Sequence, residues 1–208
     1  MKSLVTDRCI SRVIRIALLA VLHFALLGGA LAQSIDQVFF PKTENHLLIS
    51  YSVRHDMLAE NDPTPLLRIY GNGLVKVHRP YHMKLAGDYE MRLDENELQA
   101  LCREFIDRNL MSFRKEDALT QVNEAINSTG RYHGASDSSH VEISFHPRAV
   151  RLTDENVIHA VGSRAHEIAN PQMHARKSPT ATLIKNYAAL DVKLKMMLFS
   201  DRLELSKR

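Results

Sequence analysis

Hydrophobic and polar residues alternate along several short segments of the chain. Every second residue from Leu47 to Val53 is hydrophobic, and the residues between them are mostly polar. This period of two places the hydrophobic side chains on one face of a strand. Alternating runs on both sides of Gly71-Asn72-Gly73 predict a β-hairpin, because these turn residues tolerate positive φ angles. Further strands are expected from Tyr89 to Leu93 and from Val141 to Phe145.

A period near 3.6 predicts two helices in the middle of the chain. The first follows Asp94, whose side chain together with that of Glu97 can form a capping box, and it extends to Leu110. Its hydrophobic stripe includes Cys102, so we interpret this cysteine as a buried hydrophobic residue and not as a nucleophile. The second helix is shorter and ends between Asn127 and Gly130.

The longest periodic segment lies near the C-terminus. Ser178 and Pro179 suggest a cap and a first helical turn, and Asp191 is expected on the solvent side. We expect this helix to be the main cover of the sheet. Its hydrophobic stripe consists of Leu183, Ile184, Tyr187, Leu190, Leu194, Met197 and Leu198.

The order of these elements predicts an α+β fold with a mostly antiparallel sheet of about six strands, covered by the long C-terminal helix and one or two further helices. Residues 157–161 are expected to pair with the strand at 141–145, with a short extra strand around 149–152. Residues 33–45 show no clear hydrophobic period, so we expect them to form an ordered or frayed lead-in segment.

Residues 1–32 have the pattern of a signal peptide. Four basic residues precede an apolar stretch, and Ala30-Leu31-Ala32 offers small residues for cleavage. We expect residues 33–208 to form a single α+β domain in the periplasm or outside the cell. An uncleaved anchor is the alternative, although residues 16–32 barely reach across a bilayer core of about 30 Å.

Charge and composition exclude some classes of partner. The formal net charge is +3, but four basic residues and one acidic residue lie within residues 1–32, so the rest of the chain is balanced. This balance gives no reason to expect binding to nucleic acid or, after cleavage, to an anionic membrane. The remaining partner is an unknown protein or small-molecule ligand, and the oligomeric state stays open.

Histidine is the one unusual residue type, because ten of the 11 histidines follow residue 32. His78 and His82 lie four residues apart around a proline, and a bend there could bring them together with His55 or His133 to bind a transition metal ion. Ordinary solvated histidines on polar faces are the alternative. No other cofactor is indicated.

The sequence contains no H-E-x-x-H zinc motif, no G-x-S-x-G nucleophile motif and no glycine-rich phosphate loop that ends in Lys-Ser or Lys-Thr. Asp137-Ser138-Ser139-His140 contains the residue types of a catalytic triad, but contiguous residues cannot form that relay. An enzyme is therefore not favoured, and the alternative is a hydrolase with active-site residues scattered along the chain.

Three segments follow the predicted signal in a characteristic order: Leu66–Gly73 at a hairpin, Leu93–Leu98 at the start of a helix, and Ser136–Ser139 before a strand. Together they resemble uncharacterised bacterial secreted or periplasmic proteins that share a domain of unknown function. That family usually has Asp where this chain has Asn72. The resemblance implies export and fold, and it transfers no activity and no catalytic residue.

These observations favour a non-enzymatic binding or accessory protein in the periplasm. A metal-binding or pH-responsive protein based on histidine is the second hypothesis, because many imidazoles charge as the pH falls below about 6.5. The scattered-site hydrolase is the third. The fourth is an inhibitor of an extracellular enzyme, which would use a protruding loop at 55–65 or 130–139.

Overall fold

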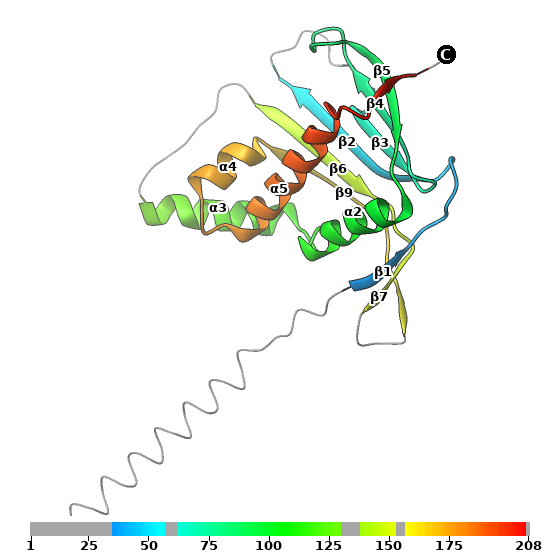
Figure 1. Cartoon of the computed structure of the whole chain (residues 1–208). Helices are drawn as coiled ribbons and strands as arrows, with labels where there is room; N and C mark the ends of the chain where they lie inside the picture. The colour runs from blue at the N-terminus through cyan, green and yellow to red at the C-terminus, as the bar shows by residue number, and fades with distance from the viewer. Residues whose placement is uncertain (1–34, 57–61, 130–137, 153–156, 207–208) are drawn as a thin grey trace, which may run out of the picture. The chain divides into compact units, whose positions relative to one another are not determined.

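Seven antiparallel strands form the main sheet in the computed structural model of the protein (Figure 1). The structure describes residues 35–56, 62–129, 138–152 and 157–206, which belong to one unit, Ser34–Arg208. The strands are β2 (Leu47–His55), β3 (Leu67–Tyr70), β4 (Leu74–Arg79), β5 (Gly87–Arg92), β6 (Ser139–Phe145), β9 (Arg164–Ala169) and β10 (Glu204–Leu205). Their order across the sheet is β10-β5-β4-β3-β2-β6-β9.

A second sheet contains β1 (Ile35–Phe39), β7 (Ala149–Leu152) and β8 (Ile158–Ala160), with β7 in the centre. The outer edge of β1 is covered by the side-chain amide of Gln99. The backbone N–H of Val38 donates to Gln99 Oε1 at 3.0 Å, and Gln99 Nε2 donates to the Val38 carbonyl at 2.8 Å. The amide therefore takes the place of a neighbouring strand at this edge.

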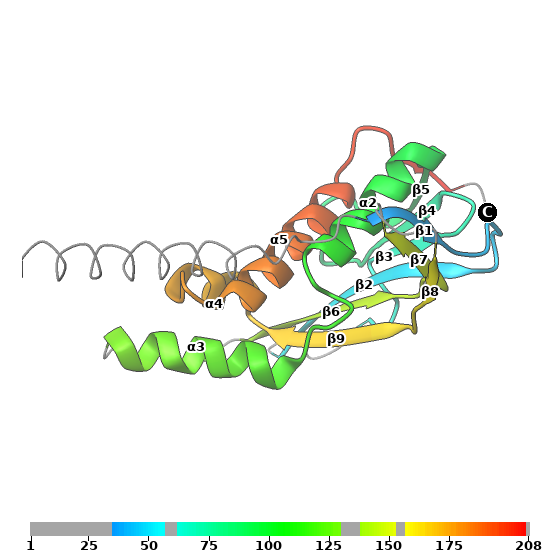
Figure 2. The ribbon, with the colours of Figure 1, turned by 90° about the horizontal axis from the view of Figure 1, so that it is seen from below.

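The helices are α2 (Glu95–Asp107), α3 (Lys115–Thr129), α4 (Pro171–Lys177) and α5 (Thr182–Met197). Helices α2 and α5 lie along the same face of the main sheet (Figure 2). Helix α3 contacts α5 and the edge strand β9, and α4 packs against α5. Within the described ranges, no helix combines the length and the hydrophobicity needed to cross a bilayer. The prediction of an α+β fold with an antiparallel sheet and a long C-terminal helix is confirmed.

The two faces of the main sheet follow directly from the alternation in the sequence. Ile49 and Tyr51 are completely buried under the helices, whereas Ser50 and Arg54 point to the other side. Neighbouring strands keep this register, because Tyr51 lies opposite Ile143 in β6 and opposite a leucine in β3. Hydrophobic residues thus meet hydrophobic residues on one face, and the other face is polar.

The predicted hairpin and capping box are both present. Gly73 in the turn between β3 and β4 has φ +81°, and a Cβ atom there would lie 2.3 Å from the carbonyl oxygen of Leu93. Only glycine fits this position. At the start of α2, the Asp94 carboxylate accepts from the Glu97 N–H and the Glu97 carboxylate accepts from the Asp94 N–H, both at 2.9 Å.

The predicted partner of the 141–145 strand was wrong. The short strand within residues 157–161 pairs with β7, so the expected extra strand at 149–152 exists, but it belongs to the second sheet. The true partner of β6 is β9. Pro147 explains the departure, because it cannot continue the strand ladder and the chain leaves the main sheet there. Strand β9 contributes only Ile168 as a completely buried hydrophobic residue, so its pattern was too weak to recognise.

Two boundaries also differ from the expectation. Residues 33–45 contain strand β1, in which Val38 is buried. Helix α5 begins at Thr182 and has no side-chain cap, whereas Ser178 ends the unpredicted helix α4 and buries its hydroxyl group. Ser178 and Pro179 therefore lie in the connection between two helices and do not start the long one.

Candidate functional site

A cavity of about 660 Å³ lies between the main sheet and the C-terminal half of α5. It is formed by segments that are distant in the sequence: the end of β2, the residue before β3, the turn after β4, and α5 with the residues that follow it. Cavities of this size commonly hold a small molecule. The lining is mostly hydrophobic and includes Val53, Leu66, Met83, Val192, Leu198 and Phe199.

Large hydrophobic side chains also remain exposed at the cavity. Val192, Met196 and Phe199 all contribute to its lining, yet they are 44%, 69% and 53% exposed. Phe199 also lines a smaller hollow with Leu85, another exposed hydrophobic residue. A concentration of exposed hydrophobic side chains on a folded protein indicates a binding surface.

Asp191 is buried next to this cavity, which corrects the prediction that it faces solvent. Its side chain has no exposed surface. One carboxylate oxygen accepts from the Tyr51 hydroxyl at 2.7 Å. The other accepts from Gln172 Nε2 at 2.9 Å and from Lys195 Nζ at 3.1 Å. The spacing did indicate burial, because Asp191 lies four residues after Tyr187 and therefore on the same face of the helix. Its charge favoured the solvent side instead.

These contacts explain how a carboxylate can be buried here. Burial of an ionised group is costly unless hydrogen bonds and an opposite charge compensate for it. Three donors from three elements fulfil this condition for Asp191. Burial, followed by the nearby Asp191 charge, raises the pKa of Tyr51 well above its ordinary value of 10, so the hydroxyl stays a donor at neutral pH.

Polar groups contribute to the same cavity. His55, Asp62, His82, Ser139 and Lys195 are part of its lining. Two of the proposed metal ligands, His55 and His82, therefore belong to one cavity. The described residues contain no group of three or more histidine, cysteine, aspartate or glutamate side chains that could hold a metal ion.

His78, the third proposed ligand, lies between two carboxylates. Its Nδ1 is 2.6 Å from Asp88 Oδ1, and its Nε2 is 2.8 Å from Asp62 Oδ2. Partial burial lowers the pKa of His78, but the hydrogen bonds with Asp88 and Asp62 outweigh this effect and raise it above 6.5. The hydrogen bond from Thr64 N–H, followed by the contact with His78, lowers the pKa of Asp62 to about 2. His133, the fourth proposed ligand, lies outside the described residues.

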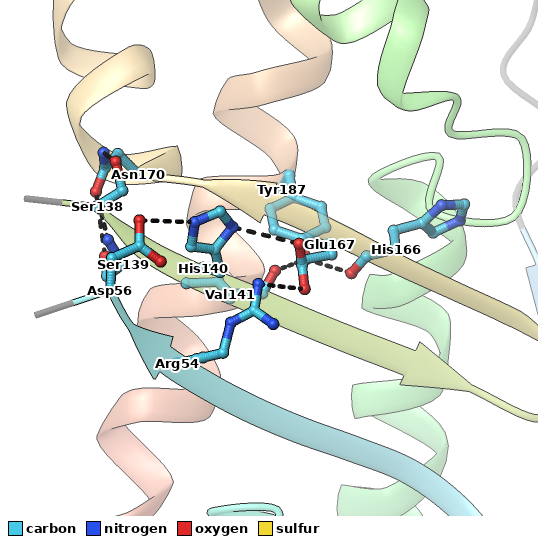
Figure 3. A network of polar contacts seen from close by, with 10 residues as sticks. All are labelled: Arg54, Asp56, Ser138, Ser139, His140, Val141, His166, Glu167, Asn170 and Tyr187. Carbon is cyan, nitrogen blue, oxygen red and sulfur yellow. Dashed lines mark hydrogen bonds and ion pairs between the residues drawn. The ribbon is translucent and has the colours of Figure 1, made fainter. Parts of the chain in front are cut away.

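A similar arrangement surrounds His140 on the polar face of the sheet (Figure 3). His140 Nε2 is 3.2 Å from Asp56 Oδ2, and Nδ1 is 3.3 Å from Glu167 Oε1. Arg54 Nη2 lies 3.7 Å from the other oxygen of Glu167. The ring of His140 thus connects the residue after β2 with β9 across the beginning of β6.

The residue types of a catalytic triad near His140 do not assemble into a relay. The Ser139 hydroxyl is 3.3 Å from Asn170 Oδ1, and Ser138 Oγ accepts from Asn170 Nδ2 at 3.1 Å. The imidazole of His140 contacts Asp56 and Glu167 instead (Figure 3). These contacts hold together the ends of strands and have the character of structural hydrogen bonds.

Cys102 has the role that its spacing predicted. Its side chain is completely buried on the hydrophobic face of α2. Burial raises the pKa of the thiol to about 12, so the reactive thiolate does not form at neutral pH.

Comparisons of the chain with protein-family models, with curated proteins and with solved structures found no match. The function must therefore be argued from the cavity and its surroundings.

Proposed function

We propose that the protein is a non-enzymatic binding protein, which takes up a small hydrophobic or amphipathic molecule in the cavity beside α5. The observation that carries this proposal is a cavity of about 660 Å³ with a mainly hydrophobic lining and exposed hydrophobic residues around it. Burial of hydrophobic surface of a ligand would provide the binding free energy. A few polar groups would then orient the ligand.

The proposed location is the periplasm or the extracellular space. The support is the pattern of residues 1–32, in which basic residues precede a hydrophobic stretch and small residues. After removal of this signal, basic and acidic residues would balance, which gives no charge that favours nucleic acid or an anionic membrane. The contacts of the described residues support a non-enzymatic role, because Cys102 is buried and His140 is held by carboxylates.

Binding of the hydrophobic fluorescent probe N-phenyl-1-naphthylamine tests the cavity. We expect saturable binding to the protein, and we expect Val192→Glu to weaken it about tenfold or more because a charge would enter the hydrophobic lining. Val157→Glu is the matched control, since Val157 is a similarly exposed valine that does not contribute to the cavity lining. Absence of saturable binding, or equal losses in the two variants, would contradict the proposal.

A second candidate function, a response to pH, is favoured by a different observation. His78 lies between carboxylates from two other segments of the chain, and its pKa is raised above 6.5. Loss of a proton from such a ring removes one of its two donors and weakens the connection. A change in stability with pH near neutrality, dependent on His78, would support this function; stability independent of pH would exclude it.

A further inference from the structure

Lys195 is the charged side chain that α5 presents at the cavity. Its ammonium group donates to Asp191 at 3.1 Å, while Asp191 also accepts from Tyr51 and Gln172. Because Asp191 is completely buried, this contact fixes the Lys195 ammonium beside the cavity, although 43% of the Lys195 side chain is exposed. A lysine held in this way loses little side-chain entropy when it contacts a ligand.

The polar groups that line the cavity favour a ligand with hydrogen-bond acceptors. An ammonium group has three donors, and Asp191 takes one of those of Lys195. The acidic residue of the lining, Asp62, has both oxygens engaged, one by the Thr64 N–H and the other by His78. Among the described residues, the cavity therefore offers an ammonium donor to a ligand, while its carboxylate acceptor is already engaged.

We infer that the ligand is an amphiphile with an acidic head group, whose carboxylate contacts Lys195 and whose hydrocarbon part occupies the cavity. This inference rests on the proposed binding function and adds the chemistry of the head group. Asp191 is a positioning residue in this arrangement, because it holds the Lys195 ammonium group and is itself held by Tyr51 and Gln172. Charge-assisted hydrogen bonds are stronger than those between neutral groups, so the acidic head group determines selectivity.

Helix α5 offers a matched control. Lys193 lies two residues before Lys195, is 51% exposed and has its Nζ 3.8 Å from Glu104 on α2. It lines a different hollow, which also includes Glu97 and Arg202, and it does not contribute to the cavity. Lys193→Met therefore removes the same charge from the same helix without changing the proposed site.

Calorimetric titration with three amphiphiles of equal chain length tests the inference. The ligands are decanoate, decanol and decylammonium, each below its micelle concentration at neutral pH. We expect decanoate to bind about tenfold or more tightly than decanol, and decylammonium to bind more weakly than decanol. In Lys195→Met, decanoate should bind only as well as decanol, whereas Lys193→Met should keep the full preference and Lys195→Arg most of it.

Each outcome has a distinct meaning. Equal affinity of the unaltered protein for decanoate and decanol overturns the head-group inference and leaves the hydrophobic binding function intact. A preference for decanoate that survives in folded Lys195→Met also overturns it. If none of the three amphiphiles binds, the head-group inference fails and the fluorescent probe decides whether the cavity binds at all. Should Lys195→Met fail to fold, Lys195→Gln takes its place in the comparison, because it removes the charge and keeps an amide donor for Asp191.

Discussion

The two faces of the main sheet are formed by the same strands but are stabilised in different ways. On the face covered by α2 and α5, Ile49 lies opposite Phe145 and Ile143 lies opposite Tyr51, and none of these side chains has exposed surface. On the other face, Ser50 lies opposite Ser144 with their hydroxyl oxygens 2.5 Å apart, and Arg54 lies opposite His140. One face is stabilised by the removal of hydrophobic surface from water, and the other by contacts between polar groups.

Histidine shows most clearly how the face determines the chemistry. His166 projects from β9 towards the helices, where its ring lies 5.0 Å from that of Phe113, and burial lowers its pKa. His78 projects from β4 between Asp62 and Asp88, and its pKa is raised. The same residue type therefore favours its neutral form under the helices and its charged form between carboxylates.

Paired substitutions on β6 should show the largest difference between the faces. Ile143→Ala removes a completely buried side chain, so we expect the free energy of unfolding to fall by about 2 to 5 kcal/mol. Glu142→Ala, at the adjacent position on the exposed face, should change it by less than about 0.5 kcal/mol. Urea unfolding of both variants measures the difference. Similar losses would contradict the assignment of the faces.

Substitution of Asp191 tests the polar group within the covered face. In Asp191→Ala the Tyr51 hydroxyl and the Gln172 amide lose their common acceptor, so we expect a loss of about 1 to 3 kcal/mol. Asp191→Asn should cost less, because it keeps an oxygen acceptor. Thermal and urea unfolding of the two variants provide the measurement. A more stable Asp191→Ala protein would mean that the hydrogen bonds do not compensate for burial of the charge.

The smallest expected effect is the pH dependence due to His78. Its pKa in the folded protein is raised above 6.5, so its contribution to stability is fully present below pH 6.5 and is lost as the pH rises through the raised pKa. We expect a decrease of less than about 1 kcal/mol between pH 6.5 and about pH 9, since the pair is partly exposed. Urea unfolding across this range should show the decrease in the unaltered protein.

Two comparisons isolate the contribution of His78. The variant His78→Gln should lack the decrease above pH 6.5. Burial lowers the pKa of His146, His166 and His174, so their contributions are lost as the pH falls below 6.5, outside the range of the measurement. A decrease of equal size in His78→Gln would assign the effect to other groups.

Local signals in the sequence were sufficient for much of the fold. The hairpin at Gly71–Gly73, the capping box of Asp94 with Glu97 and the hydrophobic stripe around Cys102 depend on residues within a few positions of each other. Weak local signals failed: β9 has too few hydrophobic residues, and the short helix α4 was not predicted.

The candidate site was much less accessible to prediction. His55 and His82 were recognised as chemically interesting, and they do contribute to the cavity, but their role as metal ligands stays a prediction. Asp191 was misplaced, and no pattern in the sequence indicated that Lys195 lines a cavity. Nothing near Asp191 in the sequence reveals Tyr51, which lies 140 positions away and provides one of its hydrogen bonds.

Neighbouring residues and backbone geometry are enough to specify the strands with clear alternation, the hairpin turn, the helix cap and the hydrophobic stripe of α5. The strand partner of β6, the burial of Asp191 and the existence of the cavity depend instead on contacts between distant segments. A buried carboxylate needs donors, and a cavity needs walls, that come from segments far apart in the chain. Only the folded arrangement brings those segments together.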